Sequence, residues 1–359
     1  MQPNGEMLRL ARQRMGFQQK EAALQLGVDQ SVLSRMENGA MEVREEVILR
    51  AEQLYEVRRT FFFQSDPIYG APVSVHPMWR RKADVTARDM DRIIAELNQR
   101  VIHLRRFLDA ADIGAAHALP RLDVDDYGEP ERIAGVLRAH WQIPDGPIRN
   151  LTVLVERAGV VVVFSALGGT AVSGVTFATP GLPPIVVLNS DQPADRMRFT
   201  LAHELGHLVM HRFPSPQMED EANAFASAFL LPSRDIAPAF KARRIDLPLL
   251  ASLKPEWKVS MQALIMKAKN LGFLTRNQEE YLWKQMSARG WRLKEPPELD
   301  FPREQPTIIA NLVKVFTTHL EYSKDELAKL LHIYTPELEA LYPTDDDGGQ
   351  LRPKFTVIG

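Results

Sequence analysis

Cysteine is absent from all 359 residues of the chain. Its absence excludes disulfides, thiolate nucleophiles and cysteine-based structural zinc sites. The sequence also lacks a run of 18 apolar residues, and its N-terminus has no charged segment followed by an apolar core. We therefore expect a cytoplasmic protein without membrane contact. Histidine and carboxylate side chains remain as the groups for catalysis and metal binding.

A strong excess of charge of either sign is also missing. Lysine and arginine number 44, aspartate and glutamate number 46, and the net charge is −2. The whole chain is therefore not drawn to nucleic acid, and any such binding must depend on local patches. The 45% of apolar and 25% of charged residues are typical of globular proteins, and the length allows two or three domains.

The segment from Thr200 to His211 contains the pattern His-Glu-x-x-His. Residues four apart lie on one face of a helix, so His203 and His207 can hold one tetrahedral metal ion. Glu204 borders the same site and can reach a metal-bound water rather than the metal. Zinc lowers the pKa of such a water to about 7, and a carboxylate can take its proton as the water attacks a carbonyl. The pattern predicts a metallopeptidase with Glu204 as its base.

An alternative interpretation makes these residues ordinary buried histidines and a glutamate on a solvated face. The helix is apolar on both sides, with Leu201, Leu205 and Leu208 among its residues. Three ionisable groups in a buried helix need partners that offset their desolvation. The context therefore favours the metal site.

A third ligand is predicted in the helical segment that follows. Glu219 and Asn223 are four residues apart on one helix face. Glu219 can therefore bind the metal, while Asn223 orients a metal ligand without binding the metal itself. Glu221 points about 200° away from Glu219, so both cannot serve, and Glu221 stays the alternative. The acidic residues here could instead be carboxylates favoured by the helix dipole. His211 lies about 12 Å along the axis from the first histidine, so we interpret it as a packing or supporting residue.

The two blocks together resemble the ImmA/IrrE family of metallopeptidases, over about residues 130–300. They are His203-Glu204-Leu205-Gly206-His207 and the pattern Glu-x-x-Ala-Asn-x-Phe-Ala-x-x-Phe-Leu-Leu-Pro that begins at Glu219. The resemblance implies zinc ligation by His203, His207 and Glu219, with Glu204 as base. Members of the family cleave or otherwise inactivate helix-turn-helix repressors of mobile elements or stress genes. The substrate itself does not follow from the motif.

Three short helices are predicted near the N-terminus, at 7–15, 18–26 and 30–37. Glycine turns separate them, the second being Gly27-Val28-Asp29, and this is the pattern of a helix-turn-helix. Asp29 can cap the third helix. The outer side of that helix presents residue types that hydrogen-bond base edges and phosphates, namely Gln30, Ser31, Ser34 and Arg35.

This stretch resembles the XRE (phage repressor and Cro-like) DNA-binding domain. Gln19 matches the glutamine at the start of the second helix, and Ser34 to Gly39 match the closing signature, whereas Ala22 replaces a larger apolar residue. The resemblance implies DNA binding through Gln19 and the outer side of the third helix, and we expect a homodimer. Charges nearly balance over the first 60 residues, so one copy should bind weakly. A helical module for protein contacts is the alternative.

The predicted fold class is α+β. An all-α helix-turn-helix domain (1–64) and a proline-rich linker (65–83) precede a zincin-like peptidase domain (84–300) with a small antiparallel or mixed sheet and active-site helices. A mostly helical tail with a flexible acidic end (301–359) follows. Strands are predicted at 159–165, 172–178 and 185–189, without a prediction of which one is the edge.

Two further helical regions are predicted. A basic helix at about 84–110 is interpreted as a solvated face over an apolar stripe, with DNA or phosphate contacts as the alternative. Residues 256–291 look helical, and 260–264 resemble a second helix-turn-helix-like segment, for which packing support of the active site is at least as good an explanation.

The sequence therefore predicts a zinc-dependent endopeptidase coupled to transcriptional regulation. It would cleave a repressor-like protein or its own linker, using the zinc-bound water that Glu204 activates. The alternative is a DNA-binding regulator whose metal-binding domain senses a ligand and cuts little or nothing. The scissile bond, the activating signal, the operator and the oxyanion-stabilising residue are not predicted.

Overall fold

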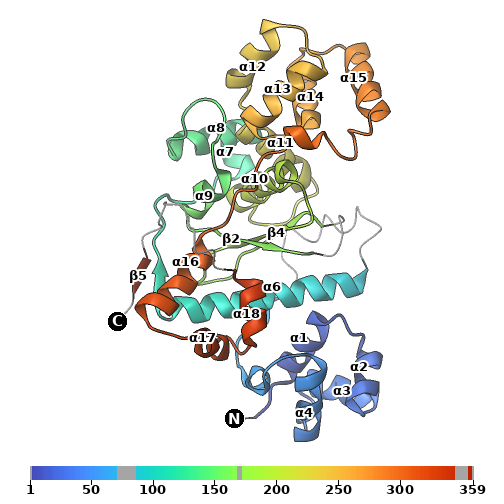
Figure 1. Ribbon diagram of the computed structural model, residues 1–359, viewed down its shortest axis with the longest axis vertical. Helices are drawn as coiled ribbons and strands as arrows, with labels where there is room; N and C mark the ends of the chain where they lie inside the picture. Colours follow the sequence, from blue (N-terminus) through green and yellow to red (C-terminus); the bar gives the residue numbers. More distant parts are fainter. Residues whose placement is uncertain (1, 71–85, 168–171, 344–354, 358–359) are drawn as a thin grey trace.

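The computed structural model describes residues 2–70, 86–167, 172–343 and 355–357 (Figure 1). Most of the predicted linker, from residue 71, and the predicted acidic end at 345–349 lie outside the described residues. Along the longest axis, the N-terminal helices occupy one end, a small sheet with its covering helices the middle, and α12–α15 the other end (Figure 1).

The N-terminal end is all-helical, as predicted. Its elements are α1 (Gly5–Arg14), α2 (Gln19–Leu26), α3 (Gln30–Glu37), α4 (Glu45–Leu54) and the 3-10 helix η1 (Arg59–Phe63). Gly27 turns the chain between α2 and α3 in the left-handed region, at φ 67°, where glycine has no steric penalty. Asp29 occupies the N-cap of α3, but the predicted capping hydrogen bond is wrong because its exposed carboxylate makes none.

The central sheet is mixed, and its order is β2-β4-β3. The strands are β2 (Val161–Ser165), β3 (Gly174–Phe177) and β4 (Ile185–Asn189). Strand β2 runs parallel to β4, whereas β3 runs antiparallel to it with Val175 opposite Val187. The two edges of this sheet are therefore β2 and β3.

Helices cover both faces of the sheet. One face packs on α10 (Ala194–Met210) and α9 (Leu151–Glu156), behind which lie α7 (Val124–Tyr127), α8 (Pro130–His140) and α11 (Met218–Leu230). The other face packs on α6 (Ala87–Leu108), α16 (Ile308–Lys314), the π-helix η3 (Val315–His319), α17 (Lys324–Leu330) and α18 (Thr335–Leu341). Because side chains alternate along a strand, Val175 and Phe177 join this second core while Gly174 and Thr176 face α10.

Helix α6 is buried between two cores, so its interpretation as a solvated face is wrong. Ala95 and Ile102 belong to the N-terminal core, whereas Leu97 and Val101 belong to the core of the sheet. Even Arg100 is buried, where it pairs with Glu96 and donates to the carbonyl of Leu341. Apolar cores thus cross the boundaries predicted at 83 and 300, and the domain division itself stays a prediction.

The far end of the molecule consists of α12 (Ser233–Ala242), α13 (Leu247–Trp257), α14 (Met261–Asn270) and α15 (Arg276–Ala288), followed by η2 (Pro297–Leu299). The buried ammonium of Lys254 joins this end to α10, with Asp195 at 2.6 Å and Glu295 at 2.9 Å. The sequence did not predict α18 or the antiparallel pair β1 (Ala111–Ile113) and β5 (Phe355–Val357). Within the described ranges, no helix is both long and apolar enough to cross a membrane.

Candidate metal centre

Helix α10 is buried almost all round, and this sets the electrostatics of the site. Every residue from Thr200 to Met210 is buried, and Glu204 is 0% exposed. Desolvated histidines and carboxylates are stable only when they are paired or bind a metal. The contacts of these groups therefore decide what the site can do.

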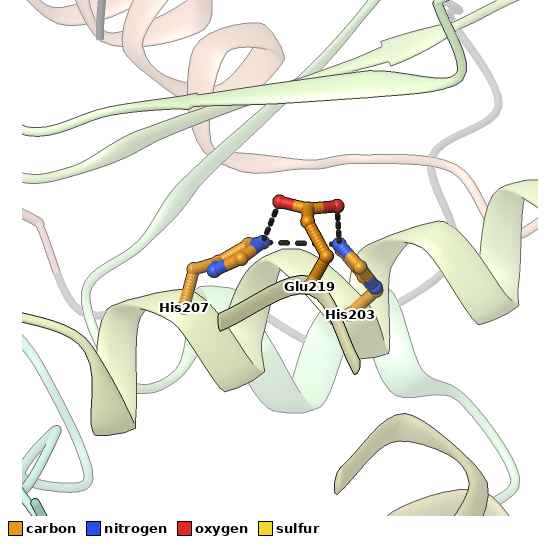
Figure 2. Close-up of side chains that lie close together, drawn as sticks. All are labelled: His203, His207 and Glu219. Carbon is orange, nitrogen blue, oxygen red and sulfur yellow. Dashed lines mark hydrogen bonds and ion pairs between the residues drawn. The ribbon is translucent and has the colours of Figure 1, made fainter. Parts of the chain in front are cut away.

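Three of the predicted residues converge on one point. The Nε2 atoms of His203 and His207 are 3.0 Å apart, and the carboxylate of Glu219 lies 3.6 Å and 3.4 Å from them (Figure 2). All three ligand atoms fit within 4.8 Å of one another. Donors at the usual zinc distances in a tetrahedron stand about 3.4 Å apart. This spacing suits a single metal ion.

Close packing of two helices brings Glu219 over the histidines. Helix α11 crosses α10 at Gly206, where an added Cβ would lie 3.0 Å from Cδ1 of Phe225 and 3.4 Å from Cα of Ala222. The glycine of the histidine motif thus allows the backbones to approach. Figure 2 shows the result, with the Glu219 carboxylate spanning both imidazoles.

Asn223 holds His203 in one orientation. Its Oδ1 lies 3.0 Å from Nδ1 of His203, and an amide oxygen can only accept, so this ring nitrogen carries the proton. Nε2 of His203 is then the nitrogen with a free lone pair, and it points at Glu219. The sequence predicted that Asn223 orients a metal ligand, and His203 is the predicted ligand that it contacts.

A second chain of contacts runs behind His207. Its Nδ1 lies 2.9 Å from Nδ1 of His211, whose Nε2 lies 3.0 Å from the carboxylate of Glu221. Burial and the neighbouring histidines lower the pKa of His211 to about 4, so it is neutral at neutral pH. Its one proton goes to Glu221, and its Nδ1 accepts from His207. Nε2 of His207 therefore also has a free lone pair.

The donor set requires positive charge at its centre. Two lone pairs face each other, and Oε1 of Glu219 is buried without a hydrogen-bond partner. Burial alone would raise the pKa of Glu219, but without a metal the hydrogen bonds and positive charge of the two histidines in their protonated form outweigh it and lower that pKa to about 2. An ionised carboxylate with two imidazole nitrogens is a common zinc donor set. Glu221 points into the chain behind His207 instead, so the geometry favours Glu219 over Glu221.

The sequence did not predict the partner of Glu204. Thr176 on β3 donates a 2.6 Å hydrogen bond to Oε2 of Glu204, while Oε1 is buried without a partner. Strand and helix can approach because position 174 is glycine, where a Cβ would stand 2.5 Å from Cγ2 of Thr200. One carboxylate oxygen is thus held in place and the other is left for chemistry.

The predicted DNA-contacting residues form two groups. Gln30, Ser31 and Arg35 are exposed on α3, and Ser34 is half-buried beside them. Gln19 instead donates from Nε2 to the carboxylate of Glu37 at 3.0 Å. Both oxygens of Glu37 also accept from the buried guanidinium of Arg12, at 2.6 Å and 2.9 Å. Gln19 thus takes part in an internal network that fixes α2 and α3.

The predicted second helix-turn-helix-like segment shares two backbone conformations with the turn of the first. Lys258, between α13 and α14, has φ 53° and ψ 48°, against 67° and 38° for Gly27 in the first turn. The N-cap Ser260 has φ −67° and ψ 153°, against −70° and 148° for Asp29. The carboxylate of Glu295, however, covers the start of α14 by accepting from two of its backbone amides.

Comparisons with known families agree with both motifs. Residues 155–269 match a peptidase family model described as IrrE N-terminal-like domain, and residues 8–62 match a model described as helix-turn-helix. The chain joins a helix-turn-helix domain to a peptidase-family domain. The first match spans the convergent histidines and Glu219, and the second runs from within α1, through α2–α4, into η1. No curated protein matches the chain.

Proposed function

We propose that this protein is a zinc-dependent endopeptidase coupled to transcriptional regulation. The single observation that carries the proposal is the convergence of His203, His207 and Glu219 beside a buried Glu204 with one free oxygen. The matches to a peptidase family and to helix-turn-helix domains support its two halves. His203, His207 and Glu219 would hold the zinc, with Asn223 and His211 orienting the imidazoles.

Bound zinc would supply a Lewis acid for the scissile carbonyl and lower the pKa of the attacking water. Oε1 of Glu204 would take a proton from this water, because Oε2 is engaged by Thr176. The same atom then delivers the proton to the leaving amine. Thr176 fixes the direction from which Glu204 acts.

Strand β3 is the edge that we propose for the substrate. It holds Thr176, and it pairs only with β4 in the described part of the sheet. An extended peptide can add to such an edge through backbone hydrogen bonds. A substrate strand on β3 would lie next to Glu204, and a repressor-like protein or the chain's own segment between α4 and α6 would provide it.

The helix-turn-helix domain would bring this activity to DNA. Gln30, Ser31 and Arg35 are exposed where the start of a recognition helix enters a major groove, with Ser34 beside them. Arg35→Ala is expected to weaken a salt-sensitive complex with DNA from the gene's own upstream region. An unchanged complex would favour a protein-docking module instead.

The test of the peptidase half combines metal analysis with Glu204→Gln. Wild-type protein should contain one zinc per chain and should cut a repressor-like protein encoded by the neighbouring gene at one site. The Glu204→Gln variant should keep the zinc and lose the cut. A protein purified without zinc that also fails to bind it when it is supplied would overturn the proposed site.

One observation favours a second candidate function, in which the chain senses a ligand and cuts little. A cavity of about 830 Å³ lies where the helix-turn-helix domain meets α6 and α18, lined by Arg14, Glu52, Gln99, Tyr334 and Glu337 among others. A small molecule bound there would touch both halves of the molecule. This candidate predicts that Glu204→Gln leaves regulation in the cell intact.

A further inference from the structure

Charge is distributed unevenly along the chain. Residues 233–294, which form α12–α15, contain 13 lysines and arginines against 5 aspartates and glutamates, a net charge of +8. We call this region the basic lobe. The first 64 residues contain 9 of each sign, and the remaining residues carry −10, given the total of −2. The helix-turn-helix domain is thus neutral, and the positive charge lies at the other end of the molecule (Figure 1).

Lys254 and Lys267 are buried and pair with carboxylates outside the lobe, but other cations of the lobe are available at the surface. Four exposed cations, Lys241, Arg244, Lys284 and Lys294, make no ion pair or side-chain hydrogen bond within the described ranges. The acidic residues of the lobe are partly neutralised, since Glu279 pairs with Lys269 and Glu280 with Arg276. Exposed cations that lack acidic partners are the groups that neutralise phosphates and release counterions.

One turn of the lobe resembles the turn of the helix-turn-helix domain. The turn between α13 and α14 repeats the dihedral angles of the turn between α2 and α3, as described above. Because Glu295 caps the start of α14 and Gln262 donates to the carbonyl of Arg292, this helix does not present free amides at its N-terminus. Contacts would therefore be made by lysine and arginine side chains with the DNA backbone. Such backbone contacts carry no sequence information.

We infer that the basic lobe is a second DNA-binding surface, one that grips the phosphate backbone irrespective of sequence. The inference does not depend on peptidase activity. The basic lobe would supply the attraction to phosphates that the neutral helix-turn-helix domain lacks. Phosphate contacts dominate the affinity of proteins for DNA. The two surfaces lie at opposite ends of the molecule (Figure 1), so one chain contacts DNA at two separated places.

The experiment uses the full chain and a fluorescein-labelled mixed-sequence DNA duplex about three helical turns long. The lobe variant carries Lys241→Gln, Arg244→Gln, Lys284→Gln and Lys294→Gln. The control variant carries Arg121→Gln, Arg132→Gln, Arg157→Gln and Arg196→Gln, four exposed arginines outside the lobe, and changes the net charge equally. Unchanged melting temperatures verify that both variants are folded.

Fluorescence anisotropy over a range of salt concentrations gives the slope of log K against log salt. The lobe variant should reduce that slope by roughly 2 or more, since each lost phosphate contact contributes about 0.9. The control variant should keep the wild-type slope. Equal slopes for the two variants would overturn the inference, as would binding of the wild type to anionic vesicles without binding to the duplex.

A third variant distinguishes this inference from the proposed DNA-binding role of the helix-turn-helix domain. In an Arg35→Ala background, the lobe substitutions should still lower the affinity for the mixed-sequence duplex. If Arg35→Ala alone abolishes all DNA binding, the lobe contributes nothing and the inference is wrong, although the role of α3 stands.

Discussion

The hydroxyl of Thr176 donates a 2.6 Å hydrogen bond from the edge strand β3 to the buried carboxylate of Glu204 on α10. This contact joins the surface proposed for the substrate to the proposed base. It also assigns different roles to the two oxygens of Glu204, because Oε2 is engaged and Oε1 has no partner. Strand, base and metal donors therefore form one unit.

Thr176→Val removes this hydroxyl and nearly preserves its volume. We expect kcat for substrate cleavage to fall about ten-fold, which corresponds to the loss of one hydrogen bond of about 1.4 kcal/mol, while the zinc content is unchanged. Thr179→Val, another buried threonine, serves as the control. Equal kcat values for the two variants would show that the hydroxyl does not position Glu204.

His211 and Glu221 should influence metal affinity although neither touches the proposed ion. His211→Ala or Glu221→Gln removes the acceptor chain behind His207, and we expect the zinc Kd to rise about 10- to 100-fold. Competition with a fluorescent chelator measures this change. Asp125→Asn, which removes an exposed charge close to Glu221, should leave the Kd near the wild-type value. A similar rise in that control would show that only the local charge matters.

Gly206→Ala places a methyl group against the ring of Phe225, 3.0 Å from its Cδ1. Overpacking of this kind costs about 1–3 kcal/mol. Because the shift separates α11 from α10, we expect a weaker zinc site together with a lower melting temperature. Wild-type stability and affinity would contradict the role given to this close approach.

The Arg12–Glu37 pair should stabilise the helix-turn-helix domain only while both partners are present. Glu37→Leu leaves the guanidinium of Arg12 buried without its carboxylate, at a cost of about 3–5 kcal/mol. Adding Arg12→Met should recover part of that loss. Urea unfolding of the two variants provides the comparison, and a double variant no more stable than Glu37→Leu would contradict the prediction.

Glu156 should make stability depend on pH. Its burial raises the pKa to about 7 despite hydrogen bonds from Ile308 and Thr307. A folded pKa above the ordinary 4.5 means that its favourable contribution is full below pH 4.5 and is lost as pH rises through about 7. The loss is at most about 3 kcal/mol.

Glu156→Gln removes this titration and retains an acceptor for the start of α16. We expect the variant to be more stable than wild type above pH 7 and to lose the advantage below pH 4.5. Denaturation midpoints measured across this range test the prediction. A constant difference between the two proteins would rule out titration of Glu156 as the cause.

Local patterns predicted much of the architecture. Helical spacing and glycine turns were enough to predict α1–α3, because that domain is built from contacts between residues close in sequence. Short apolar segments separated by turn residues predicted the three strands, and the mixed sheet was one of the alternatives. The spacing of His203, His207 and Glu219 also predicted a convergence that the structure shows, because one helix turn sets two of the positions.

Long-range contacts explain what the sequence did not reveal. Thr176 meets Glu204 only because β3 packs on α10, and nothing in its own segment marks it. The burial of α6 depends on helices from both ends of the chain, so its charges looked like those of a solvated face. Strand β1 pairs with a segment near the C-terminus, and no local signal can predict such a partner.

The most direct test of the proposed peptidase activity is the mass of the neighbouring gene's product after incubation with zinc-loaded wild type and with Glu204→Gln. A zinc peptidase with Glu204 as its base should give two fragments from one cut with wild type and leave the product intact with the variant, at equal zinc content. The same cut by both proteins, or no cut by zinc-loaded wild type, would contradict it.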